Sequence, residues 1–116
     1  MNFKLIVALV SNERTEKVIE KAREMGATGA TVITSGRGEG LTPHKTFFGL
    51  TLEEQVDMVL FIVEQHLSRD ILEGIATIGH FETKSGSGIA MQLNIEDAVG
   101  LRTQLEAIEQ EIEEQI

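Results

Sequence analysis

Two nearly continuous apolar runs constrain the fold of this chain more than any other feature. They span residues 3–10 and 56–63, and both are rich in β-branched and aliphatic side chains. Runs of this length and composition predict strands that are buried on both faces. We therefore expect two central strands of one sheet, with a covering layer on each side.

Segments with other periods surround these runs. Residues 30–34 predict a short strand. Another is predicted over residues 89–96, where large apolar side chains at the odd positions alternate with Ala90, Gln92, Asn94 and Glu96. A first helix is predicted after Ser11 or Asn12, either of which can cap it, and Gly26 would end it. A second is predicted from Ser68, as N-cap, to Gly79. Their apolar faces comprise Val18, Ile19, Ala22 and Met25 in the first helix, and Ile71, Leu72, Ile75 and Ile78 in the second.

The order of these elements predicts an α+β fold. It is the βαββαβ plan of a ferredoxin-like sandwich with an antiparallel sheet. An additional amphipathic C-terminal helix with an acidic outer face is expected over about residues 101–116, and residues 1–116 are expected to form one domain. Two helices cover only one face of the sheet, so self-association is expected to cover the other.

A long segment without periodicity, residues 35–55, separates the two halves. It holds four glycines, the only proline (Pro43) and the adjacent pair Phe47 and Phe48. Loops of this length inside a compact domain are usually functional. Adjacent aromatic residues on a polar loop favour an anchor for another protein, and we predict that Lys45, Phe47 and Phe48 contact a partner. The alternative is that the two rings pack onto the domain.

Composition excludes several classes of function. The formal net charge is −9, which argues against a nucleic-acid partner. The chain has no cysteine, so thiol chemistry and disulfides are excluded and a cytoplasmic location is expected. The apolar N-terminal run is too short for a signal segment or a membrane span, so no membrane insertion is expected.

Four short segments carry a resemblance to a known family. The first two are residues 26–32 (Gly-Ala-Thr-Gly-Ala-Thr-Val) and the glycine-rich residues 36–40. The others are residues 83–88 (Thr-Lys-Ser-Gly-Ser-Gly) and Leu101-Arg102-Thr103, where the pattern ends. Over roughly residues 3–103 the chain resembles the PII and PII-like signal-transduction proteins. The match is one of pattern more than of identity.

The resemblance implies a trimer that binds an adenine nucleotide, ATP, ADP or AMP, in clefts between subunits. It implies that Thr31 lies against the adenine and that Lys84 and Arg102 balance phosphate charge. The exposed T-loop, about residues 36–55, would dock onto a target such as a membrane transporter or a metabolic enzyme, in nitrogen or carbon regulation. The nucleotide-binding residues so implied are Thr31, Gly36, Arg37, Gly38, Lys84, Gly86, Gly88 and Arg102.

Departures from the family pattern indicate a divergent branch. Ile89 stands where the family has a lysine, and Gly100 where it has the first arginine of a pair. The chain has no tyrosine, so nucleotidylation of that residue type cannot occur. We expect a preference for AMP, ADP or another effector over ATP. Gly86 and Gly88 have an alternative explanation, since both would also serve a tight loop into a strand.

Two other functions on the same scaffold remain open. A metal-binding trimer resembling the CutA group would require folding or trimerisation to gather the three histidines, His44, His66 and His80. A small ferredoxin-like enzyme would need an acid–base pair, for which only scattered carboxylates are available: Asp57, Glu64, Asp70 and Asp97. No serine–histidine–acid arrangement, P-loop or dinucleotide signature occurs, so we expect no catalysis and no metal site.

Overall fold

The computed structural model describes residues 2–34, 45–47, 50–52, 56–84 and 86–100. Within these residues the chain forms six strands, two α-helices and one 3₁₀ helix. In order they are β1 (Phe3–Ser11), η1 (Asn12–Arg14), α1 (Thr15–Glu24), β2 (Ala30–Thr34), β3 (Lys45–Phe47), β4 (Leu50–Leu52), β5 (Val56–Glu64), α2 (Gln65–Gly79) and β6 (Gly88–Asn94).

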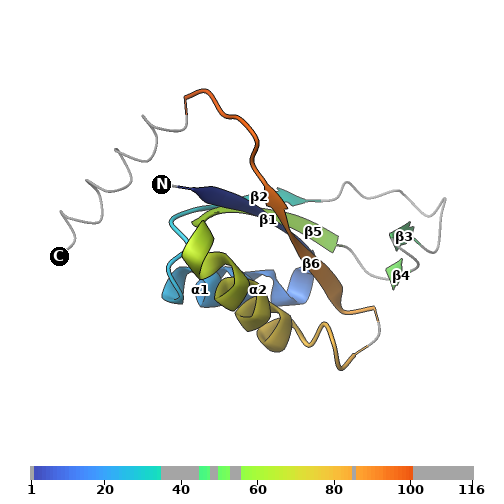
Figure 1. Ribbon diagram of the computed structural model, residues 1–116. Helices are drawn as coiled ribbons and strands as arrows, with labels where there is room; N and C mark the ends of the chain where they lie inside the picture. The colour runs from blue at the N-terminus through green and yellow to red at the C-terminus, as the bar shows by residue number, and fades with distance from the viewer. Residues whose placement is uncertain (1, 35–44, 48–49, 53–55, 85, 101–116) are drawn as a thin grey trace.

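The main sheet has the strand order β2-β5-β1-β6, and every neighbouring pair in it is antiparallel. Both α-helices lie on the same side of this sheet (Figure 1). The two apolar runs form its central strands, β1 and β5, as their composition predicted. The α+β ferredoxin-like fold is thereby confirmed. Strands β3 and β4 pair separately as a short hairpin.

The hydrophobic core lies between the helices and one face of the sheet. Alternate residues of β1 and β5 point into it, because side chains alternate across a strand. Phe61 is the largest of the fully buried side chains. The core residues are Ile6, Ala8 and Val10 from β1, Val59, Phe61 and Val63 from β5, Val18, Ile19 and Ala22 from α1, and Ile71 and Ile75 from α2, together with Ala27.

The opposite face of the sheet, here called the open face, is also apolar. The register places side chains from all four strands on it, and no described helix covers them (Figure 1). Ile33 and Leu93 at its two edges are 50% and 43% exposed. The apolar residues of the open face are Ile33, Val56, Met58, Leu60, Ile62, Leu5, Val7, Leu9, Ile89, Met91 and Leu93. Leu9 and Val56 are already buried within the chain, with Met58 and Ile89 packed against them.

The predicted helix limits need three corrections. Ser68 does not cap α2, because β5 runs directly into the helix at Gln65 and Ser68 lies buried in the first turn. Gly79 is the last helical residue rather than the stop, and His80 takes the left-handed conformation with φ 58°. Neither Ser11 nor Asn12 caps α1, because η1 comes first and the N-cap position of α1 is Arg14. Gly26 does end α1 with φ 113°, as predicted.

Two predicted segments lie largely outside the described residues. The T-loop, about residues 36–55, is described only at β3 and β4, and the C-terminal helix over residues 101–116 is not described. Among the described helices, none is long and apolar enough to cross a membrane.

The connection from α2 to β6 is packed around the ring of Phe81. A Cβ atom at Gly79 would lie 2.4 Å from Phe81 Cε1, and one at Gly88 would lie 2.6 Å from the same atom. At Gly88 the Cβ would also approach the backbone oxygen of Leu9 to 2.5 Å, and the φ angle there is 155°. Gly88 is therefore required by packing, because a Cβ there would meet a backbone oxygen, whereas a Cβ at Gly79 would displace only the Phe81 ring.

Two isoleucines on α2 give a matched test of the core. Ile71 is fully buried, whereas Ile78, predicted on the same apolar face, is 36% exposed. We expect Ile71→Ala to lower the free energy of unfolding by about 2–5 kcal/mol because it leaves a cavity. Ile78→Ala should cost about 1 kcal/mol or less. Urea unfolding of both variants measures the difference, and equal losses would contradict this burial pattern.

Two glycines test the packing at the entry to β6. Gly88→Ala should destabilise the fold by about 2 kcal/mol or more, because the new Cβ meets a backbone oxygen and an aromatic ring. Gly29→Ala is the control, since a Cβ there has no heavy atom within 4 Å. Thermal unfolding compares the two variants. A neutral Gly88→Ala would show that the ring and the strand are not packed as described.

Candidate functional site

Two loops leave the sheet at the same end. Thr34 pairs with Asp57, Asp57 pairs with Val10, and Val10 pairs with Gly88, so these four residues form one row across the sheet. The chain departs from this row after Thr34, towards the predicted T-loop, and arrives at it through residues 80–87, which precede β6. We call the second connection the β6-entry loop. The candidate site is therefore this end of the sheet.

The β6-entry loop is held by a single carbonyl. The oxygen of His80 accepts bonds from the amides of Thr83 and Lys84, at 3.3 and 3.0 Å, and from the hydroxyl of Ser87 at 2.8 Å. The amide of Ser87 donates to the Lys84 carbonyl at 3.2 Å. Ser87 is only 5% exposed. Hydrogen bonds thus connect the start of the loop to its end.

The predicted loop residues differ in exposure. The side chain of Lys84 is exposed, and Gly86 is half-buried with a left-handed φ of 77°. Gly88 is buried beneath Phe81, so its lack of a side chain has a packing reason that requires no ligand. Within the described part of this loop, Lys84 and Gly86 are therefore the predicted residues most open to an anion.

Thr31 lies at the other edge of the sheet. It is exposed on β2, where it pairs with Leu60, three residues along the strand from the loop row. Strands β5 and β1 separate β2 from β6. Three strand spacings amount to about 14 Å. One chain therefore does not bring Thr31 together with Lys84 and Gly86.

The structure does not describe the side chains of the remaining predicted site residues. Lys45 and Phe47 belong to β3, where only the backbone is described. The others, Gly36, Arg37, Gly38, Phe48 and Arg102, lie outside the described residues.

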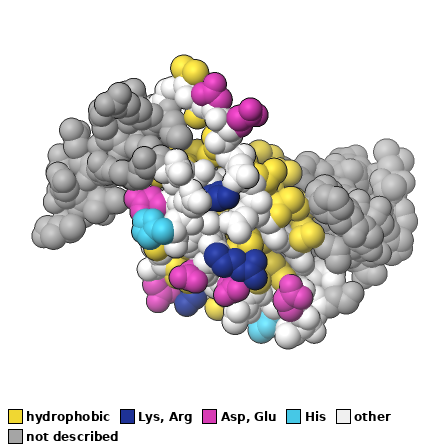
Figure 2. All heavy atoms as spheres, viewed as in Figure 1, with side chains coloured by type: hydrophobic (Ala, Val, Ile, Leu, Met, Phe, Trp, Pro, Cys, Tyr) yellow, Lys and Arg dark blue, Asp and Glu magenta, His cyan; other side chains and the backbone are white. Residues whose placement is uncertain are grey.

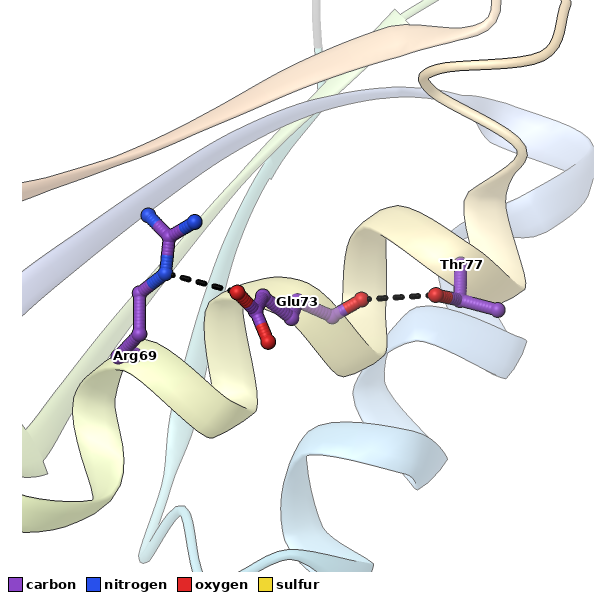
Figure 3. A network of polar contacts seen from close by, with 3 residues as sticks. All are labelled: Arg69, Glu73 and Thr77. Atoms are coloured by element: carbon purple, nitrogen blue, oxygen red, sulfur yellow. Dashed lines mark hydrogen bonds and ion pairs between the residues drawn. The ribbon is translucent and has the colours of Figure 1, made fainter.

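A shallow hollow of about 900 Å³ lies beside the β6-entry loop, between α2 and β6. On this side of the molecule, charged side chains gather over the helices and hydrophobic ones lie towards the sheet (Figure 2). Along α2, Arg69 Nε bonds Glu73 Oε1 at 2.9 Å, and Thr77 Oγ1 donates to the Glu73 carbonyl at 3.0 Å (Figure 3). These polar contacts follow the i, i+4 spacing of one helix and fix one wall of the hollow.

Asp57 connects the loop row to α1. Its carboxylate Oδ2 accepts a bond of 2.6 Å from the hydroxyl of Thr15, and both residues are buried. The sequence did not indicate this pair, because the two residues are far apart along the chain. A buried carboxylate needs such a donor, so the bond fixes the start of β5 against the helix.

The carboxylates considered for catalysis are dispersed. Asp57 and Glu64 stand at opposite ends of β5, about 23 Å apart at the rise of a strand. Glu64 Oε2 lies 3.3 Å from His66 Nε2, and Asp70 and Asp97 are exposed. The structure therefore does not bring these carboxylates into one acid–base pair.

The histidines are also apart. His66 and His80 lie at opposite ends of α2, separated by about 21 Å along the helix axis. His44 is outside the described residues. Among the residues described, no group of three histidine, cysteine or acidic side chains is arranged to hold a metal ion.

Solved structures share this fold. One is CPII from Thiomonas intermedia bound to ADP, AMP and acetate, with 20% identity, a TM-score of 0.59 and coverage of 86% of this chain and 92% of that one. Another is a PII-like signaling protein from Thermus thermophilus, with 21% identity, a TM-score of 0.57 and coverage of 82% of this chain and 91% of that one. A search of the curated proteins found no match.

The family itself is identified from the sequence. The model of the family described as nitrogen regulatory protein P-II matches residues 3–105, which is most of the chain and includes both loops at the end of the sheet. The matched residues include every described helix and strand, as well as the β6-entry loop. The chain therefore belongs to the P-II family of regulatory signal proteins.

Proposed function

We propose that this protein is a non-catalytic cytoplasmic regulator that binds an adenine nucleotide between the subunits of a homotrimer. Nucleotide occupancy would change the T-loop, about residues 36–55, and so control a partner transporter or metabolic enzyme. The observation that supports the proposal is the position of two predicted site residues: Thr31 lies on β2 at one edge of the sheet, and Lys84 precedes β6 at the other edge.

The open face supports the assembly. Its side chains come from all four strands of the main sheet, and a large contiguous apolar surface of this kind is typical of an interface. Copies arranged head to tail around an axis would bury it and close into a ring. In such a ring the β2 edge of one copy faces the β6 edge of the next, so Thr31 of one subunit meets Lys84 and Gly86 of its neighbour.

The chemistry of the two halves fits a nucleotide. An exposed strand carrying Thr31 offers a surface for adenine, and the β6-entry loop offers an ammonium group and a glycine amide for phosphate. Gly36, Arg37, Gly38 and Arg102 would complete the phosphate site. Ile89 replaces the family lysine after the loop, so fewer phosphates are neutralised and AMP or ADP is favoured over ATP. CPII bound to ADP and AMP supports this class of ligand.

In this proposal the T-loop is the segment through which the bound nucleotide changes binding to the partner. It begins after Thr34, in the same row of the sheet as Gly88, so a ligand between subunits would contact both loops. Ordering or release of a loop by a bound phosphate is a common switch. Lys45, Phe47 and Phe48 would then be presented to the partner or withdrawn from it.

One variant of the open face tests assembly and binding together. Leu60→Glu places a charge in the proposed interface on a central strand, so we expect light scattering to give the mass of one chain in place of the trimer of the wild type. Calorimetric titration with AMP, ADP and ATP should show binding to the wild type and at least a tenfold loss, about 1.4 kcal/mol, in the variant.

Ile78→Glu is the matched control. It adds the same charge at an exposed position of α2, away from the open face, and should leave both mass and affinity unchanged. A wild type that binds no nucleotide at millimolar concentration would contradict the proposed ligand. A monomeric Leu60→Glu that binds as tightly as the wild type would contradict a site shared between subunits.

A further inference from the structure

The hydroxyl of Ser87 makes the one side-chain bond that closes the described part of the β6-entry loop. It donates to the His80 carbonyl at 2.8 Å and is almost fully buried. The bond links the end of the loop, one residue before β6, to its beginning, one residue after α2. It therefore fixes the separation of the two ends independently of the strand ladder.

The bonds inside the loop determine which groups remain for a ligand. The amides of Thr83, Lys84 and Ser87 are used within the loop. The Gly86 amide donates to none of the described residues, and the left-handed φ of this glycine lies between the two bonded segments. Among the described loop residues this leaves two amides that donate to no described residue, those of Glu82 and Gly86, and the exposed ammonium of Lys84. The Gly86 amide follows Lys84 most closely on the β6 side of the loop, and these two groups are available to an anion.

We propose that Ser87 is a positioning residue for the phosphate groups of the nucleotide. By donating to the His80 carbonyl it holds the Gly86 amide and Lys84 in the arrangement that binds phosphate, without touching the ligand itself. This inference rests on the proposed function. It predicts that loss of the hydroxyl weakens the binding of phosphate and leaves the binding of the adenosine part unchanged, because Thr31 lies on another strand.

Ser68 provides a matched control for a purely structural role. It is 3% exposed, and its hydroxyl also donates to a backbone carbonyl, that of Gln65, at 2.9 Å. It lies at the opposite end of α2 from His80. Ser68→Ala and Ser87→Ala each remove one buried hydroxyl-to-carbonyl bond, so the two variants should lose similar stability in thermal unfolding.

The test is calorimetric titration of the full chain with adenosine, AMP and ADP. We expect Ser87→Ala to weaken ADP binding about tenfold, AMP less, and adenosine not at all. Ser68→Ala should match the wild type with all three ligands. Ser87→Thr keeps the hydroxyl and should bind ADP like the wild type. This result would attribute the loss in Ser87→Ala to the hydrogen bond with the His80 carbonyl.

The outcomes separate the two proposals. Wild-type affinity for ADP in Ser87→Ala, or equal losses in Ser87→Ala and Ser68→Ala, would overturn the positioning role and leave the nucleotide site intact. An equal loss for adenosine and ADP would also overturn it, because the hydroxyl would then act on the fold and not on phosphate. A wild type that binds none of the ligands would overturn both proposals.

Discussion

A sheet that is apolar on both faces but covered on one governs the rest of this structure. The helices bury one set of alternating residues, including Ile6, Val59 and Phe61, and the opposite set, including Val7 and Leu60, has no described helix above it. Burial of such a surface is the dominant favourable term in association as well as in folding. In the proposed trimer, the need to cover the open face connects the fold of one chain to an assembly of several, and the proposed site depends on that assembly.

Much of the fold could be predicted from the sequence because hydrophobic period and length are local signals. The two long apolar runs identified the central strands, and the glycine at position 26 identified the end of α1. The ends of α2 could not be predicted, since Ser68 is an equally good cap and first-turn residue, and the choice is made by β5 continuing directly into Gln65. The alternation of large apolar residues in β6 was visible in the sequence. The register with β1 was needed to show that these residues face away from the helices.

The candidate site was predictable in kind but not in arrangement. The glycines and Lys84 of the β6-entry loop could be recognised in the sequence, and they lie within the residues that the family model matches. The role of His80 as the acceptor of three bonds could not be predicted, because it depends on a left-handed backbone at a residue other than glycine. Two strands separate Thr31 from the loop, and this follows from the strand order, which the spacing of residues along the sequence does not reveal. Phe81 similarly explains Gly88 only once the chain has folded.

The most direct measurement is complementation between two chains that are each defective in one half of the site. Thr31→Glu blocks the half on β2, and Lys84→Glu blocks the half on the β6-entry loop. Each variant alone should fail to bind ADP. Mixed trimers, coproduced with two different tags and purified through both, should recover about one functional site per trimer, because one junction in the ring joins two intact halves. Mixed trimers that bind no ADP, although the wild type does, would place the whole site within one chain and contradict a site formed between subunits.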